Sequence, residues 1–177
     1  MKQYNYGEVP LEDILARQEE KAALSAAVAD IIAAVRREGS EALRRYAQTF
    51  DGAAPAQLEV GSAELDRAAA SLDPELRAIL EEAAGNIRAF HSRQVRNSFV
   101  ISEQDGIILG QKVTPLDRVG LYIPGGTAAY PSTVLMNAIP AKLAGCSEVV
   151  MVSPPSKGGD IAPVILAAAK IAGVDRV

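Results

Sequence analysis

The sequence is poor in the side chains that build disulfides and metal centres. It contains a single cysteine, Cys146, and a single histidine, His91. One cysteine cannot form a disulfide within the chain, and one histidine cannot supply the clustered ligands of a structural zinc site. The composition therefore argues against a disulfide-stabilised domain and against a zinc centre built by this chain alone.

Long apolar runs, an apolar leader and an excess of positive charge are also missing. The longest apolar runs, Val149–Val152 and Val164–Ala169, fall short of the roughly 20 residues that a membrane helix needs. Residues 1–10 have neither the apolar segment nor the cleavage site of a signal peptide, so we expect a cytoplasmic protein without a membrane partner. The net charge is −4, with 18 basic and 22 acidic side chains, which argues against binding of nucleic acid. A small molecule or another protein is the expected partner.

Apolar residues make up 49% of the chain, and in its first half they recur at helical spacing. The pattern predicts helices over residues 21–38, 40–50, 63–71 and 74–93. Gly39 is expected to end the first helix, Ser62 to cap the third, and Asp73 to cap the fourth, with Pro74 at its first position. The fourth helix carries one apolar stripe, formed by Leu76, Ile79, Leu80, Ala83, Ile87 and Phe90.

The pattern changes to strands near Ser98. Two short apolar segments, Phe99–Ser102 and Ile107–Gly110, flank Asp105 and Gly106. An Asp-Gly pair suits the positive φ angles of a type I′ turn, so the sequence predicts an antiparallel hairpin.

Strands and helices alternate after the hairpin. The predicted order is a strand over 119–123, a helix over 132–144 capped by Ser132, a strand over 148–152, a helix over 160–172 and a strand from 174 onward. Such alternation implies a parallel sheet with helical crossovers. Pro140 is expected to kink or split its helix, because it cannot donate a hydrogen bond to Met136.

The predicted fold class is therefore α/β: amino-terminal helices and a β-hairpin, followed by a partial Rossmann-like parallel sheet with helical crossovers. We expect residues 1–116 to be part of a first domain. Residues 117–177 would be the first half of a Rossmann-like nucleotide-binding domain.

The segment Pro115–Thr127 reads PLDRVGLYIPGGT and places Pro124, Gly125 and Gly126 directly after a predicted strand. The carboxyl ends of parallel strands are where open α/β sheets bind ligands, and glycines allow a ligand to approach the backbone. The segment is not the GxGxxG fingerprint of dinucleotide-binding folds, and an ordinary turn is the alternative interpretation.

A longer stretch, Pro115–Pro155, closely resembles the corresponding stretch of histidinol dehydrogenases. Two earlier parts of the chain resemble the same family: Gly39–Gly52, with GSEAL and TFDG, and Asn86–Gln94. The resemblance covers most of the chain from about residue 30.

Histidinol dehydrogenases oxidise L-histidinol to L-histidine through a bound aldehyde in two NAD-dependent steps, and zinc holds the substrate. The resemblance implies a homodimer of subunits with incomplete Rossmann-like domains, an architecture shared with aldehyde dehydrogenases. It also implies that Tyr122 contacts NAD and that Pro124, Gly125 and Gly126 form the loop beside the cofactor. The alternative for Tyr122 is packing against the next helix.

The resemblance places the zinc ligands and the catalytic Glu-His pair of the family in a later part of a longer chain. We therefore expect this chain to be a fragment that is inactive alone. Cys146 follows a predicted helix end, which disfavours a thiolate, and is expected in the core; His91 is expected at the surface or in a domain contact. Two alternatives remain: another reductase of the aldehyde-dehydrogenase-like group, or a nucleotide-binding module without catalysis.

A truncated sheet is expected to leave strand edges open and the last helix uncovered. The apolar residues of that helix face are Ile161, Val164, Ile165, Ala168 and Ile171. The sequence therefore predicts self-association, with a twofold dimer as the expected form.

Overall fold

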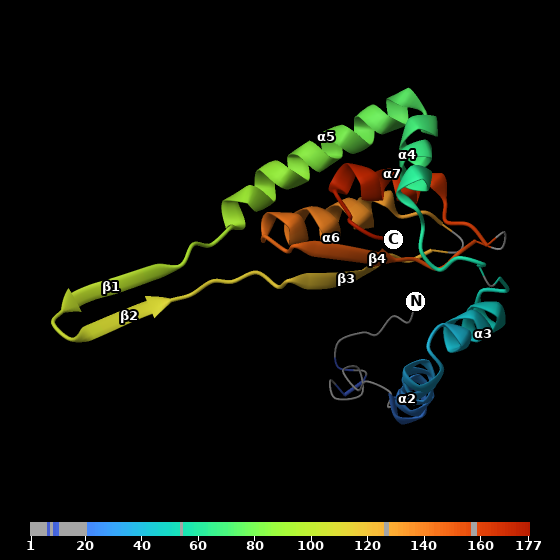
Figure 1. Ribbon diagram of the computed structural model, residues 1–177, viewed down its shortest axis with the longest axis horizontal. Helices are drawn as coiled ribbons and strands as arrows, with labels where there is room; N and C mark the ends of the chain where they lie inside the picture. Colours follow the sequence, from blue (N-terminus) through green and yellow to red (C-terminus); the bar gives the residue numbers. More distant parts are fainter. Residues whose placement is uncertain (1–6, 8, 11–20, 54, 126–127, 157–158) are drawn as a thin grey trace. The chain divides into compact units, whose positions relative to one another are not determined.

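Figure 1 shows the computed structural model of the chain. The residues that the structure describes are 7, 9–10, 21–53, 55–125, 128–156 and 159–177. They divide into two units, residues 1–43 and 44–177, and each unit is described by itself. Within the described residues no helix is both long and apolar enough to cross a membrane.

Two helices form the described part of the amino-terminal region. Helix α2 spans Lys21–Glu38 and ends at Gly39, which takes the left-handed conformation with φ of 60°. Helix α3, Ser40–Phe50, begins in the first unit and continues into the second. Both helices and the glycine between them confirm the sequence prediction.

Two further helices follow in the second unit. Helix α4 spans Ser62–Ser71 and is preceded by Gly61, so Ser62 is the first helical residue and its predicted capping role is wrong. Helix α5 spans Pro74–His91 and is followed by a short 3₁₀ turn, η1, over Ser92–Gln94. Asp73 caps α5 as predicted, because its carboxylate accepts hydrogen bonds from the backbone N–H groups of the first turn.

The hairpin is present, with β1 over Phe99–Gln104 and β2 over Ile107–Gln111. Only Gly106 has a positive φ, of 77°, so the predicted type I′ turn, which needs positive φ at Asp105 as well, is wrong. A register shift between Ile101 and Gln104 marks a bulge in β1. A bulge increases the right-handed twist of the strands, and type I′ and II′ turns suit hairpins because they match the same twist.

The parallel sheet is built from β3, Arg118–Tyr122, and β4, Glu148–Val152. The carboxyl-terminal segment extends it, since Arg176 forms a parallel bridge to Val150 on β4. Val60 adds a further contact by donating a backbone hydrogen bond to Val177. The sheet region therefore brings the segment before α4 next to the carboxyl-terminal segment, which is far from it in sequence.

The crossovers are helix α6, Pro131–Leu143, and helix α7, Pro163–Ala172. Tyr130, and not Ser132, occupies the cap position of α6, and the first residue of each helix is a proline. Pro140 does not split α6, which stays continuous to Leu143. Because Pro140 lies three residues before the helix end, only the last turn has to adapt to its missing N–H group.

The core lies between one face of the sheet and the helices, and Figure 1 shows α6 and α7 on the same side of the sheet. Its largest fully buried side chains are Ile123, Val134, Leu135, Ile139, Val149 and Met151. Cys146 is buried in the same cluster, which confirms its predicted core position.

The predicted exposure of the last helix is wrong. Helices α4 and α6 both pack against α7, so Ile165 and Ala168 are 3% and 0% exposed. The missing cover is supplied by α4, which is distant in sequence, because a helix that is apolar over most of its surface is stable only when enclosed in this way. The boundary between residues 116 and 117 stays a prediction.

Candidate functional site

Tyr122 is the last residue of β3 and lies beside Val152, the last residue of β4. The two side chains are 66% and 58% exposed. Alternate residues of β3, Val119 and Leu121, turn inward and pack against the core. Tyr122 therefore belongs to the opposite face of the sheet, and its ring is available to a ligand.

The loops that follow the two strands lie against each other. A side-chain carbon at Gly125 would come within 2.9 Å of the carbonyl oxygen of Pro154 and 3.2 Å of the hydroxyl of Ser153. Gly125 has no positive φ, so its lack of a side chain serves this close contact and not an unusual backbone conformation. Pro124 is exposed beside it, and Gly126 lies outside the described residues.

Two hollows open at this end of the sheet. One, of about 100 Å³, has Gly125, Ser153 and Pro154 in its wall. The other, of about 520 Å³, lies between the segment that precedes α4 and the loop that follows β4, and Ser153 and Ile161 line both hollows. The exposed ring of Tyr122, the paired loops and the two hollows make this edge the candidate ligand site.

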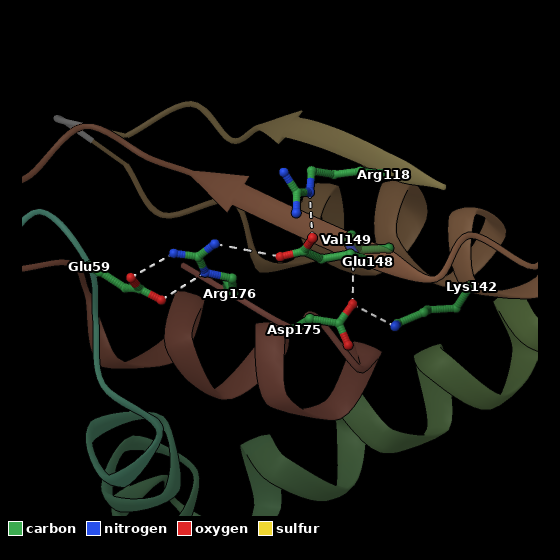
Figure 2. A network of polar contacts seen from close by, with 7 residues as sticks. All are labelled: Glu59, Arg118, Lys142, Glu148, Val149, Asp175 and Arg176. Atoms are coloured by element: carbon green, nitrogen blue, oxygen red, sulfur yellow. Dashed lines mark hydrogen bonds and ion pairs between the residues drawn. The ribbon is translucent and has the colours of Figure 1, made fainter. Parts of the chain in front are cut away.

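A network of charged side chains, shown in Figure 2, begins at the amino ends of the two strands and reaches Glu59, which also lines the larger hollow. Arg118 begins β3, Glu148 begins β4, and their side chains form an ion pair. Arg176 lies 3.6 Å from Glu148 and binds both oxygens of Glu59 at 2.8 Å. These contacts join β3, β4, the carboxyl-terminal segment and the segment before α4.

Charged contacts in this part of the protein shift three pKa values. The hydrogen bond and positive charge of Arg176 hold the pKa of Glu59 below its usual range, and Glu59 raises the pKa of Arg176. Burial raises the pKa of Asp175, but hydrogen bonds from Lys142 Nζ and from the backbone N–H of Val149, both 2.6 Å long, outweigh it and leave that pKa lowered. The folded state therefore favours the charged form of the Glu59 and Asp175 carboxylates, which form ion pairs in it.

Sequence reasoning missed this network. Arg118 and Glu148 stand at the first positions of two predicted parallel strands, and this shared register was a signal that could have paired them. No comparable signal links Glu59 with Arg176, which are 117 residues apart.

The remaining candidate side chains lie away from the carboxyl edge of the sheet. His91 ends α5, its Nδ1 is 2.6 Å from Gln94 Oε1, and it lines a small hollow with Pro140. Among the residues described by the structure, no group of three or more His, Cys, Asp or Glu side chains could hold a metal ion.

Comparison with known proteins identifies the family. The family model of histidinol dehydrogenase matches residues 15–177. The chain belongs to the histidinol dehydrogenase family. It is 53% identical to the histidinol dehydrogenase of Geobacillus kaustophilus (strain HTA426) over 151 residues, which are 85% of this chain and 36% of that protein. It is 50% identical to the histidinol dehydrogenase of Cupriavidus pinatubonensis over 175 residues, 94% of this chain and 39% of that protein.

A solved histidinol dehydrogenase has the same fold. The crystal structure of the enzyme from Elizabethkingia anophelis is similar to 94% of this chain, with a TM-score of 0.82 and 35% sequence identity. The match covers 39% of that chain. The present chain therefore spans little more than a third of the length of its histidinol dehydrogenase relatives.

Family membership confirms the resemblance found in the sequence and the α/β fold class. It decides against another reductase of the aldehyde-dehydrogenase-like group. The relatives are named histidinol dehydrogenases.

Proposed function

We propose that this chain contributes part of the NAD site of a cytoplasmic histidinol dehydrogenase, which oxidises L-histidinol to L-histidine. Tyr122 supplies an aromatic contact to the cofactor, and Pro124, Gly125 and Gly126 form the adjoining loop. The observation that carries the proposal is the 66% exposed ring of Tyr122 at the carboxyl end of β3, in a chain of this family.

The carboxyl edge of the sheet has room for a dinucleotide beside Tyr122, which itself lines neither hollow. Sites for ligands of this size usually enclose roughly 300–1,000 Å³, so the hollow of about 100 Å³ is too small alone and the adjoining one of about 520 Å³ falls within the range. The amino termini of α6 and α7 follow β3 and β4, and such termini favour phosphate groups. When bound, NAD accepts a hydride from the substrate.

Zinc fits the described residues less well. No cluster of three metal-ligating side chains occurs among them, and a zinc site needs three or four ligands. We therefore assign no residue of this chain to the metal and derive no step through it.

An NAD titration of the isotope-labelled chain, followed by heteronuclear NMR, tests the proposal. Backbone signals of residues 121–125 and 153–155 should shift on addition of NAD. Tyr122→Ala should weaken binding about five- to tenfold, because a lost aromatic contact costs roughly 1 kcal/mol.

Phe90→Ala is the matched control. Phe90 lies near the end of α5 and is also 66% exposed, so the substitution removes an aromatic side chain of equal fractional exposure outside the proposed site. Equal loss of affinity in both variants, or no loss in either, would return Tyr122 to a structural role.

A further inference from the structure

The larger hollow, of about 520 Å³, has one wall without regular secondary structure. Residues 55–60, the segment before α4, form neither helix nor strand, and all six line this hollow. The other wall contains Ser153, Pro155 and residues 159–161 from the loop after β4. A segment outside helices and strands opens more easily than a sheet, so the shape of the hollow depends on the contacts that hold residues 55–60.

The segment is held near each of its ends through backbone atoms. Arg44 Nη2 donates a hydrogen bond of 3.4 Å to the carbonyl oxygen of Ala56. At the other end, Val60 N–H donates to the carbonyl oxygen of Val177 at 2.8 Å, and the Val60 side chain packs against the core. Residues 57–59 lie between these two points.

Glu59 supplies the polar contact of this middle part that the structure describes. Nε and Nη2 of Arg176 donate to the two carboxylate oxygens of Glu59, both at 2.8 Å. Two parallel hydrogen bonds fix the direction of a carboxylate as well as its distance. The ion pair therefore determines where residues 57–59 lie.

Arg176 is itself held by β4. Its carbonyl oxygen accepts a hydrogen bond from Met151 N–H at 2.8 Å, and its backbone forms the parallel bridge to Val150. Its Nη1 lies 3.6 Å from Glu148 at the start of the same strand, as Figure 2 shows. The sheet thus places the guanidinium group, and the guanidinium group places Glu59.

The ion pair between Arg176 and Glu59 is exposed to solvent. The two side chains are 50% and 57% exposed, and ion pairs at the surface contribute little to folding stability. Glu59 lines the larger hollow, whereas Arg176 does not. An effect of Arg176 on a ligand in the hollow therefore has to act through the position of Glu59.

We propose that Arg176 is a positioning residue of the ligand site, which holds Glu59 and residues 57–59 in place as one wall of the larger hollow. The inference rests on the proposed function, because it takes this hollow to accommodate part of NAD. With Arg176 present, the wall is ordered before the ligand binds. Without Arg176, the ligand has to order residues 57–59, and this loss of conformational entropy opposes binding.

An NAD titration of the Arg176→Met variant of the 177-residue chain, followed by heteronuclear NMR, tests the proposal. The dissociation constant for NAD should rise about three- to tenfold, as expected when a ligand has to order a few residues. In the absence of NAD, NMR relaxation should show lower order parameters for the backbone of residues 57–59 in the variant than in the parent chain.

Arg77→Met is the matched control. Arg77 forms an ion pair with Glu81 that has the same length, 2.8 Å, and similar exposure, 52% and 50%, and it lines neither hollow beside the sheet. The control should change the midpoint of urea denaturation about as much as Arg176→Met does. It should leave the affinity for NAD unchanged.

Two further variants separate position from charge. Arg176→Lys keeps a positive charge near Glu148 but loses the paired hydrogen bonds, so it should fold like the parent chain and bind NAD more weakly. Glu59→Gln combined with Arg176→Met removes both charges and should bind as weakly as Arg176→Met alone. If Arg176 acted by neutralising Glu59 beside the phosphate groups of NAD, this double variant would bind as well as the parent chain.

Parent-like affinity in any of the three Arg176 variants, unchanged order parameters at residues 57–59, or an equal loss of affinity in Arg77→Met would overturn the proposal. These results would leave the proposed role of Tyr122 intact. A parent chain that does not bind NAD would instead overturn the proposed function together with this inference.

Discussion

Gly125 has no side chain at a point where two loops nearly touch. The space that a side-chain carbon would take is closed by backbone and ring atoms of Pro154, at 2.9 and 3.1 Å. This contact ties the loop after β3 to the loop after β4. The shape of the candidate site therefore depends on the absence of a side chain at Gly125.

Gly125→Ala should lower stability by about 1–3 kcal/mol, because an overpacked contact against backbone cannot relax freely. Gly120→Ala is the matched control. Gly120 lies in the middle of β3, has no positive φ and would meet no atom within 4 Å, so alanine should be neutral or slightly stabilising there. Urea denaturation measures both, and equal midpoints for the two variants would show that the loops separate easily.

Asp175 connects charge to stability at the other end of the sheet. Its pKa is lowered in the folded state, so its contribution is present above its unfolded value of about 3.9 and is lost as the pH falls through the folded value. Asp175→Asn should therefore destabilise the protein at neutral pH and make little difference well below pH 4.

The measurement is the denaturation midpoint of the two proteins as a function of pH. Glu82→Gln on the exposed side of α5 provides the control, because none of the ion pairs described above involves Glu82. A stability difference between Asp175→Asn and the parent chain that stays constant down to pH 2 would contradict the assignment.

At the scale of elements, helix α5 shows what periodicity predicts and what it leaves open. The spacing of apolar residues correctly predicted the helix and its cap at Asp73. It grouped Ile79 with Leu80 in one stripe, but Leu80 is 6% exposed and Ile79 is 54% exposed. Which part of a stripe is covered depends on the neighbouring helices α6 and α7, and those contacts are not encoded in local spacing.

Substitutions at Ile79 and Leu80 can be compared directly, because the two residues are adjacent in α5. Leu80→Ala should destabilise the protein by about 2–5 kcal/mol, since it leaves a cavity between α5 and the core. Ile79→Ala should cost less than about 1 kcal/mol, because its side chain already meets solvent. Thermal unfolding distinguishes them, and similar losses in both variants would mean that Ile79 has a partner in solution.

At the scale of the whole molecule, the sequence predicted the α/β class, the hairpin and the order of β3, α6, β4 and α7. Tyr122 and Pro124 stand where the strand prediction placed them, at the carboxyl edge of the sheet. The sequence wrongly predicted that the apolar face of α7 is uncovered. Helix α4 covers it, and this contact between elements distant in sequence depends on the tertiary fold.

The catalytic capacity of the chain is testable directly. We expect no NAD reduction by the purified 177-residue chain with L-histidinol, with or without added zinc, because the chain spans little more than a third of the length of the histidinol dehydrogenases that it matches. The full-length enzyme from Geobacillus kaustophilus, assayed in parallel, is the positive control. Reproducible turnover by this chain would refute the expectation.

The hydrogen bond from Val60 to Val177 and the ion pair from Glu59 to Arg176 have a consequence for the order of folding. They close a loop with a sequence separation of 117 residues, whereas β3, α6 and β4 are neighbours along the chain. Closing a long loop costs conformational entropy before the stabilising contacts have formed, and contacts of high sequence separation therefore slow folding. The local β3–α6–β4 unit should therefore assemble first, and the segment before α4 should pair with residues 176–177 in a later step.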